Sequence, residues 1–375
     1  MRLGLFLGIR ILAFRWARLL AAFAGIGVAV VVMFIELGLL LGILDSQALV
    51  ADLVRGELVV VSQARTNLHK WNEFDRIRLY QIGSLPGVDS VLPVYQGTMG
   101  LRVPESGEVR RIVVLSFVPG ELPLAVGDQN NVAEGLETSR VVFFDRRSRP
   151  IFGDIRPGAD VELDGQSYRV GGYVDIGPDI VNDGSVVMSV GSWLERHPAS
   201  RPIMGVVRLQ PGQDVQAMKQ AIVRAIPDDV AIFTPAEIRA REVRFTLRSA
   251  PIGALFGIGM LAGLVIGAIT CYQILFNEIV DRLDQYAMLK AMGFSDGFLK
   301  RIVLEQAFLL SCGGFVLGLA VAYFLYNYIA DVTALVVRLS LVSAGTIFLL
   351  TAAMSGVAGL LAVRKAIRAD PAELY

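Results

Sequence analysis

The chain has 375 residues, is 54% hydrophobic, and carries 35 basic and 35 acidic side chains, so its formal charge is zero. This composition is more apolar than that of most soluble proteins, and zero net charge excludes a global field that would attract nucleic acid. The two cysteines, Cys271 and Cys312, lie in long apolar runs, so no disulfide framework is indicated. His69 and His197 are far apart in sequence and fit loop histidines better than metal ligands.

Four apolar runs are each long enough to cross a bilayer, which takes about 20 residues. A buried core helix can also be apolar all round, but four such runs in one chain favour membrane spans. We therefore predict a membrane α-helical protein with four transmembrane helices and a large α+β extracytoplasmic domain between spans 1 and 2. The spans are expected at residues 19–44, 251–277, 302–329 and 341–363.

Arginine and lysine residues near the ends of the spans predict the orientation of the chain. They gather in residues 1–18, 278–301 and 364–375, whereas the short link 330–340 holds only Arg338. This pattern predicts a multi-pass protein of the bacterial inner membrane. Both termini are expected in the cytoplasm, and residues 45–250 are expected in the periplasm.

The first 18 residues fit two structures. An amphipathic helix lying on the inner face of the membrane is one, and a simple extension of the first span is the other. The apolar run that follows is longer than the core of a signal peptide and lacks a small-residue cleavage site, so we expect an uncleaved anchor.

The segment between the first two spans has a mixed pattern. Two βαβ-type halves enclosing a β-rich insertion fit the order of its elements. At Thr234-Pro-Ala-Glu237, threonine can cap a helix, proline suits its first turn and the glutamate can reach back. Helical stalks are expected at both ends of the segment. Strands are expected at 57–62, 88–95, 203–209 and 229–233, helices at 73–82 and 215–226, and short β-like runs within 110–190.

The stretch Gly293-Phe-Ser-Asp-Gly297 matches the nucleophile elbow of hydrolases, which requires a preceding strand and a nearby histidine. A helical pattern precedes it instead, so we expect Gly293 to end one helix in a left-handed conformation and Ser295 to cap the next. The chain also has no Gly-Lys pair, hence no phosphate-binding P-loop, and no H-E-x-x-H motif. We expect no catalytic residue, no bound metal and no cofactor.

Glycines recur at intervals of four within the apolar runs, at Gly259, Gly263 and Gly267 and again at Gly314 and Gly318. Small residues at this spacing let helix backbones approach closely in lipid. They are therefore expected to pack helices together, either within one chain or against a second copy.

Two acidic residues, Glu36 and Glu305, interrupt apolar runs. Carboxylates inside a membrane are costly and invite a functional interpretation. Both are nevertheless expected near an interface, and Glu305 follows Arg301 by one helical turn. Ordinary ion pairing is the favoured interpretation, and proton or ion coupling is the alternative.

Residues 278–301 carry four acidic and four basic side chains between two apolar runs. Eight charges cannot remain in hydrocarbon, so we place this segment in the cytoplasm. A short helix joined to two spans can dock into a groove on a soluble partner and move both spans. A passive helical connection is the alternative. An apolar patch is expected from Leu283, Tyr286, Ala287, Leu289 and Met292.

The same segment carries a family resemblance. Gln285–Phe294 (QYAMLKAMGF), then Leu304–Phe308 and the glycine-rich Gly313–Gly318, resemble the permeases of the MacB and FtsX superfamily. The ending at 364–374 is similar to theirs. In the long inserted segment, VVVS, VDSVLPVY and FDRRSRP resemble the DevC-type exporter permeases.

This resemblance implies an ABC-transporter permease that works as a homodimer with a separate ATPase subunit, which would bind ATP and Mg. The cytoplasmic insert would be the coupling helix that rests on this ATPase. Two of its positions depart from the family pattern, because an acidic residue is usual at Gln285 and an arginine at Asp284. The implied coupling residues are Asp284, Gln285, Tyr286, Leu289, Lys290, Ala291, Met292, Gly293 and Phe294.

The DevC-type resemblance further implies a membrane-fusion adaptor protein, a TolC-like outer-membrane channel and export of a hydrophobic cargo such as a glycolipid. Two alternatives stay open. One is an FtsX-like transmitter that controls a periplasmic enzyme, and the other is a LolC-like permease that releases lipoproteins.

Overall fold

The structure is a computed structural model that describes residues 16–64, 72–178, 182–249, 251–333 and 338–368. The chain divides into two compact units. The membrane unit combines residues up to Gly42 with most of the chain from Pro251 onward, and the inserted domain is Ile43–Ala250.

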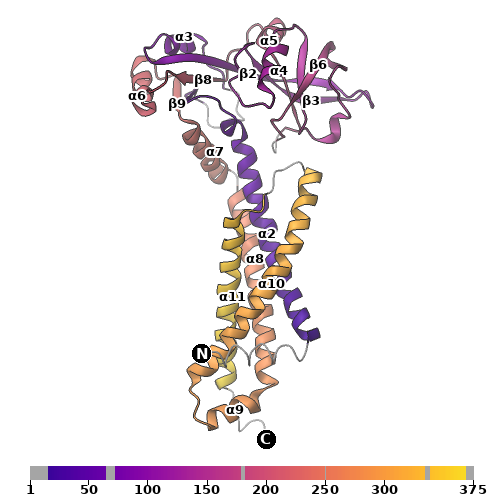
Figure 1. Ribbon diagram of the computed structural model, residues 1–375, viewed down its shortest axis with the longest axis vertical. Helices are drawn as coiled ribbons and strands as arrows, with labels where there is room; N and C mark the ends of the chain where they lie inside the picture. The colour runs from indigo at the N-terminus through magenta and orange to yellow at the C-terminus, as the bar shows by residue number, and fades with distance from the viewer. Residues whose placement is uncertain (1–15, 65–71, 179–181, 250, 334–337, 369–375) are drawn as a thin grey trace. The chain divides into compact units, whose positions relative to one another are not determined.

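The membrane unit is a bundle of four long helices, shown in Figure 1. Each helix contains a stretch long and apolar enough to cross a bilayer, and the inserted domain that follows the first helix is α+β, which confirms the predicted fold class. A short fifth helix, α9 (Leu283–Ala291), links the second and third long helices. The long helices are α2 (Trp16–Asp52), α8 (Ile252–Val280), α10 (Asp296–Thr333) and α11 (Leu341–Arg368).

The long helices exceed the apolar runs that predicted them. Helix α10 begins at Asp296, inside the expected coupling segment, and continues to Thr333, inside the expected loop 330–340. Helix α11 likewise runs past 363 to Arg368. Hydropathy marks only the part of a helix that lies in hydrocarbon, whereas backbone hydrogen bonds continue beyond it. Of the predicted segment 1–18, the first 15 residues lie outside the described part, as do residues 334–337 and 369–375.

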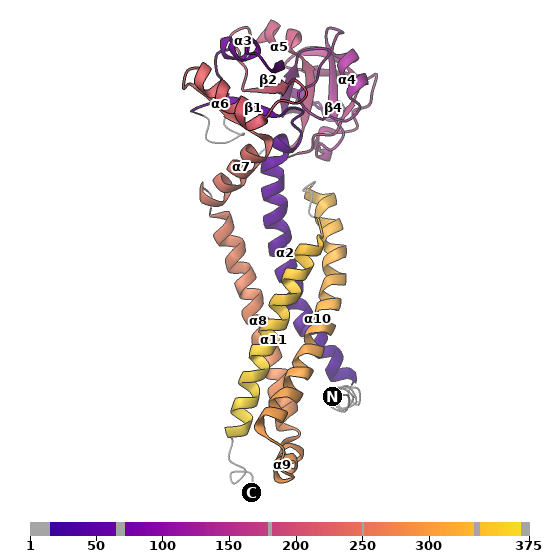
Figure 2. The same ribbon diagram turned by 60° about the vertical axis from the view of Figure 1, so that its left-hand side comes forward.

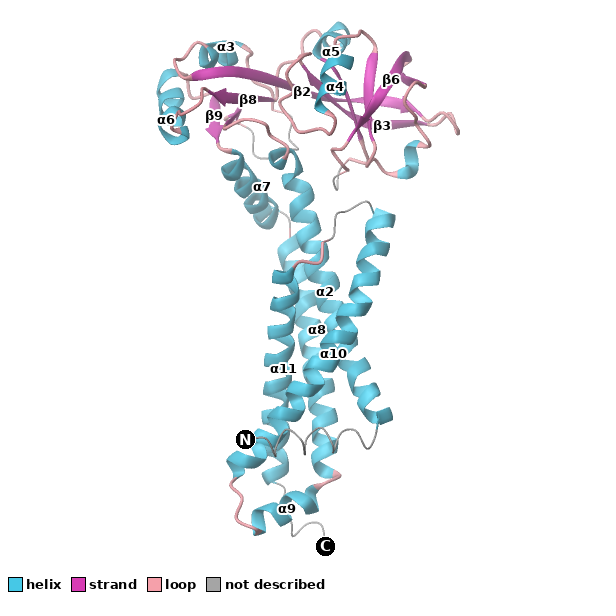
Figure 3. Cartoon of the chain, viewed as in Figure 1, coloured by secondary structure: helices cyan, strands magenta, loops and turns pink. Residues whose placement is uncertain are grey.

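The inserted domain contains a four-stranded antiparallel sheet in the order β2-β8-β1-β9, drawn in magenta in Figure 3. Strand β8 lies between β1 and β2, and β1 lies between β8 and β9, so two βαβ units interlock. One unit connects its strands through α3 and the other through α6. The elements are β1 (Leu58–Ser62), α3 (Ile77–Gly83), β2 (Val88–Arg102), β8 (Met204–Leu209), α6 (Val215–Ala225) and β9 (Val230–Phe233).

Helix α3 begins four residues later than expected at Glu73. The backbone N–H of Phe74 donates to the Pro202 carbonyl (3.1 Å), and the Phe74 side chain is buried. These contacts hold residues before the helix in an extended form. The helix then starts where an Asp75 carboxylate oxygen accepts the N–H of Ile77 (3.0 Å).

The β-rich insertion forms a closed six-stranded barrel. Its ring of paired strands runs β2-β3-β7-β4-β6-β5 and returns to β2, with parallel pairs β3/β7 and β4/β6. The long strand β2 therefore belongs to both the sheet and the barrel. Short helices α4 (Gln129–Gly135) and α5 (Val190–Arg196) complete it. The other barrel strands are β3 (Val109–Phe117), β4 (Val141–Asp145), β5 (Asp160–Leu163), β6 (Gln166–Val174) and β7 (Ser185–Ser189).

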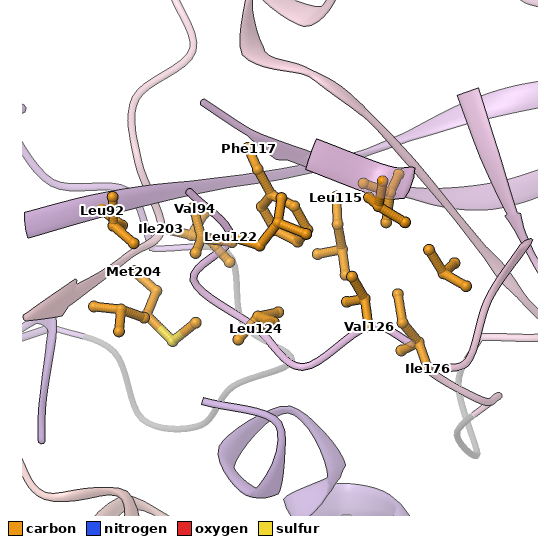
Figure 4. Packing of buried hydrophobic residues seen from close by; sticks show 14 of the residues in the cluster. Leu92, Val94, Leu115, Phe117, Leu122, Leu124, Val126, Ile176, Ile203 and Met204 are labelled. Carbon is orange, nitrogen blue, oxygen red and sulfur yellow. The ribbon is translucent and has the colours of Figure 1, made fainter. Parts of the chain in front are cut away.

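A continuous apolar core joins the sheet to the barrel. Figure 4 shows Leu92 and Val94 of β2 beside Ile203 and Met204, and Leu115 of β3 further along the same cluster. Because one cluster includes side chains from both subdomains, the two fold as a single domain.

The carboxylate of Asp145, at the end of β4, is completely buried, and a buried charge is costly unless it is hydrogen-bonded. Burial raises the pKa of Asp145, and the hydrogen bonds that it accepts offset only part of this rise. Its carboxylate oxygens accept the backbone N–H groups of Arg147 (3.1 Å), Ile176 (3.1 Å) and Gly177 (2.8 Å) and the hydroxyl of Ser185 (3.2 Å).

Helix α7 (Pro235–Ser249) begins with the predicted capping box. The Thr234 N–H donates to Glu237 (2.8 Å) and the Glu237 N–H donates to the Thr234 hydroxyl (3.2 Å). Lys219 also donates to the Glu237 carboxylate (2.5 Å). Burial alone would raise the pKa of Glu237, but Lys219 and Thr234 outweigh burial and hold that pKa below its usual value.

Candidate coupling segment

The candidate site is the segment from α9 to the start of α10, at one end of the helix bundle (Figure 2). Helix α9 ends in a Schellman motif. The N–H of Phe294 donates to the Leu289 carbonyl (3.2 Å), and the N–H of Gly293 donates to the Lys290 carbonyl (2.9 Å). Gly293 has φ +91°, so the expected left-handed helix end is confirmed. A side chain at Gly293 would be strained there.

The turn after Gly293 leads directly into α10. The Ser295 carbonyl accepts the N–H groups of Phe298 (2.9 Å) and Leu299 (3.4 Å), so the new helix starts at this residue. A helix, rather than a strand, precedes Ser295, which removes the context that a nucleophile elbow requires. Among the described residues, no group of three potential ligands could hold a metal ion.

Helix α9 has an inward face and an outward face. The inward face consists of Leu283, Tyr286 and Leu289, which are half-buried, and Tyr286 packs on the apolar core of the bundle. Burial raises the pKa of the Tyr286 hydroxyl above its usual value. Tyr286 therefore attaches α9 to the bundle.

The outward face of α9 consists of exposed residues: Asp284, Gln285, Ala287, Met288, Ala291 and Met292. Met288 is 64% exposed and Met292 is 62% exposed. Next to it, the rings of Phe294 and Phe298 stack with centroids 4.7 Å apart, and both are exposed. Large apolar side chains grouped on one exposed helix face mark an interaction surface.

Two ion pairs brace the segment. Arg282 pairs with Glu278 on the last turn of α8 (2.7 Å), and Lys290 pairs with Asp296 across the turn (3.0 Å). The second pair joins the end of α9 to the start of α10, so it favours one geometry of the hairpin. Both its members are about half exposed, so its contribution to stability is small, about 0–1 kcal/mol.

The nine predicted coupling residues thus lie in one helix and its turn, but they do not share one face. Tyr286 and Leu289 point inward, whereas Asp284, Gln285, Ala291 and Met292 lie on the outward face. Their contact with an ATPase stays a prediction. Met288 and Phe298 are also exposed here, although neither was among the predicted residues. Met288 follows Asp284 by one turn and precedes Met292 by one turn, and this spacing was the available signal.

The five predicted packing glycines lie at contacts between helices of the same chain. On α8, a Cβ added at Gly263 would lie 3.1 Å from Met33 of α2, and one at Gly267 would lie 2.6 Å from Met354 of α11. On α10, a Cβ added at Gly314 would lie 2.5 Å from Ile26 of α2, and one at Gly318 would lie 2.6 Å from Val30 of α2. An added Cβ at Gly259 would overlap the carboxylate of Glu36. Helix α2 therefore packs closely against both α8 and α10.

The two acidic residues within the spans, Glu36 and Glu305, differ in whether they form an ion pair. Glu305 pairs with Arg301 one turn before it (3.1 Å), as expected. Glu36 makes no hydrogen bond and no ion pair with any residue that the structure describes. The expected interfacial pairing of Glu36 is therefore not found within the described part of the chain.

Four helices of membrane-spanning length, with α9 inserted between the second and the third, define a multi-pass membrane unit. Residues 245–371, which include α8, α9, α10 and α11, match the FtsX-like permease C-terminal family. This match covers 127 of the 375 residues.

No curated protein matches the chain. Among solved structures, the chain is similar to the periplasmic region of MacB from Actinobacillus actinomycetemcomitans, with 10% identity, a TM-score of 0.37, and coverage of 50% of this chain and 92% of that one. It is also similar to the extracellular domain of the noncanonic ABC-type transporter YknZ from Gram-positive bacteria. There the identity is 13%, the TM-score is 0.33, and the coverage is 48% of this chain and 98% of that one.

Proposed function

We propose that this chain is the permease subunit of a DevC-type exporter. It couples ATP hydrolysis by a separate ATPase to a conformational change on the periplasmic side of the membrane. That change drives export of a hydrophobic cargo such as a glycolipid, together with a membrane-fusion adaptor and a TolC-like outer-membrane channel. The functional unit is a homodimer of the permease, and ATP and Mg bind to the ATPase.

One observation carries this proposal: α9 presents an exposed face of methionines beside a stacked phenylalanine pair, on a hairpin braced by ion pairs. A rigid hairpin that joins two membrane helices passes a push on the hairpin to both helices. Methionine suits such a face because its flexible, polarisable side chain adapts to a partner groove. The proposal puts α9 on the cytoplasmic side, where an ATPase would be.

Purification of the full chain in mild detergent, followed by mass spectrometry of bound proteins, tests the proposal. We expect an ABC ATPase and a membrane-fusion adaptor. A chemical cross-link from a cysteine at Met292 to the ATPase is expected as well, and Asn277→Cys, on the last turns of α8, provides the comparison position.

Other partners would overturn the export role. A periplasmic peptidoglycan hydrolase in place of the adaptor would indicate an FtsX-like transmitter, and bound lipoproteins would indicate lipoprotein release. Labelling of a cysteine at Lys290 from the periplasmic side would overturn the orientation, and with it the coupling role of α9.

A further inference from the structure

Glu36 is an acidic residue in the membrane unit with no protein partner among the described residues. Its side chain is half-buried, and its carboxylate occupies the notch left by the missing side chain of Gly259 on α8. Any Cβ at Gly259 would overlap it. The contact between α2 and α8 therefore holds this carboxylate in a fixed place.

Apolar residues flank Glu36 and Gly259 along their helices. On α2, Val32 and Leu40 lie one turn to either side of Glu36. On α8, Leu255 and Ile258 are 66% and 67% exposed. A carboxylate in such surroundings is costly unless a positive group neutralises it.

The described basic residues of the membrane unit do not supply that group. Arg282, Lys290 and Arg301 pair with other acids near the α9 end of the bundle. Within the described part of the chain, no ion pair joins Glu36 to Lys300, Arg338 or Arg364. Charge complementarity thus calls for a positive group from outside the described chain.

The depth of Glu36 suggests where that group comes from. Helix α8 has 29 residues, which makes it about 43 Å long at about 1.5 Å per residue. A bilayer including its headgroups has a similar thickness, about 40–45 Å. Gly259 lies seven residues after Ile252, which places it about 10 Å from the end of α8 that follows the inserted domain. With α8 spanning the bilayer from one headgroup layer to the other, the carboxylate lies just inside the hydrocarbon.

We infer that the Glu36 notch binds the primary ammonium of a membrane phospholipid, of the phosphatidylethanolamine type. The ammonium donates charge-assisted hydrogen bonds to the carboxylate, and the acyl chains lie along Leu255 and Ile258. A quaternary choline has no N–H to donate and is bulkier at the nitrogen, so the site discriminates against it. The lipid would lie in the seam between α2 and α8, where it supports the contact between these helices.

Native mass spectrometry of the full chain tests this site. The protein, with its own lipids removed, is equilibrated with micelles that contain phosphatidylethanolamine or phosphatidylcholine with identical acyl chains. We expect the wild type to retain the ethanolamine lipid about tenfold better than the choline lipid, as fits a charge-assisted hydrogen bond. Glu36→Gln, which keeps the side-chain shape, should abolish this preference.

Glu305→Gln is the matched control, because Glu305 already pairs with Arg301. It should keep the lipid preference. Gly259→Ala should reduce the preference like Glu36→Gln, because its methyl group displaces the carboxylate. Equal retention of both lipids by the wild type, or an unchanged preference in Glu36→Gln, would overturn the inference. Either result would favour a second copy of the chain, or a proton, as the group that neutralises Glu36.

Discussion

The double substitution Met288→Asp with Met292→Asp tests the outward face of α9 most directly. Both side chains are more than three-fifths exposed, so the permease itself gains little from them. Full burial of a methionine side chain contributes about 1.5–3 kcal/mol. Covering the exposed part of each would therefore contribute about 1–2 kcal/mol to docking, or roughly 2–4 kcal/mol for the pair.

This sum corresponds to a factor of roughly 30 to 1,000 in the dissociation constant of the ATPase. Two aspartates in the same groove would add the cost of desolvating their charges. We therefore expect the double variant to bind the ATPase at least about 100-fold more weakly. Its ATP hydrolysis should no longer respond to the permease.

The assay is a titration of the purified ATPase against the permease in lipid nanodiscs, with the thermal midpoint of the permease measured in parallel. Met288→Leu with Met292→Leu is the matched control and should bind within a few-fold of the wild type. Leu289→Asp is the contrasting variant. Its side chain is on the inward face, so it should lower the thermal midpoint of the permease. If the double aspartate variant bound the ATPase within threefold of the wild type, the docking role of this face would be refuted.

Three further substitutions test the packing and the electrostatics. Gly314→Val would press a side chain into Ile26 and should cost about 1–3 kcal/mol, seen as a lower thermal midpoint in detergent. Gly345→Ala, which meets open space, should leave that midpoint unchanged, and equal midpoints for both would contradict the packing argument. Asp145→Asn replaces an acceptor oxygen with a donor, so it should destabilise the inserted domain by roughly 2–4 kcal/mol in denaturant titrations followed by tryptophan fluorescence. A loss below about 0.5 kcal/mol would count against the burial argument. Glu237→Gln should cost about 0.5–1 kcal/mol at pH 7, a modest value because the carboxylate is partly exposed. Folding lowers the pKa of Glu237. Its contribution to folding stability is therefore present above the unfolded pKa of about 4.3 and is lost as pH falls through the lower folded pKa. A Gln variant whose stability depends on acid pH as the wild type does would contradict this.

Much of the fold could be predicted from local sequence, because local physics determines it. The strand at Leu58–Ser62 and the capping box at Thr234 lie where their patterns indicated. The length of β2 could not be predicted beyond Tyr95, because glycines disfavour a strand interior. Gly97 is required there because the Trp193 ring packs directly against it, and the pairing of β2 with β3 comes from a distant part of the chain.

The faces of α9 illustrate the same limit for the candidate site. The sequence indicates a short helix with apolar residues, and Gly293 indicates where it ends. It does not indicate which apolar residues turn inward, because that depends on where the long helices provide a surface. Leu289 and Met288 are adjacent and both apolar, yet only Met288 lies on the outward face. Hydropathy cannot separate them.

The fifteen-residue strand β2 has a mechanical consequence. Its first half forms hydrogen bonds with β8, and its second half forms them with β3 and β5. A hinge between sheet and barrel would have to disrupt the backbone hydrogen bonds of one continuous strand and open the apolar cluster beneath it. The inserted domain is therefore a stiff body, and a torque applied at one end reaches the other without being absorbed by bending.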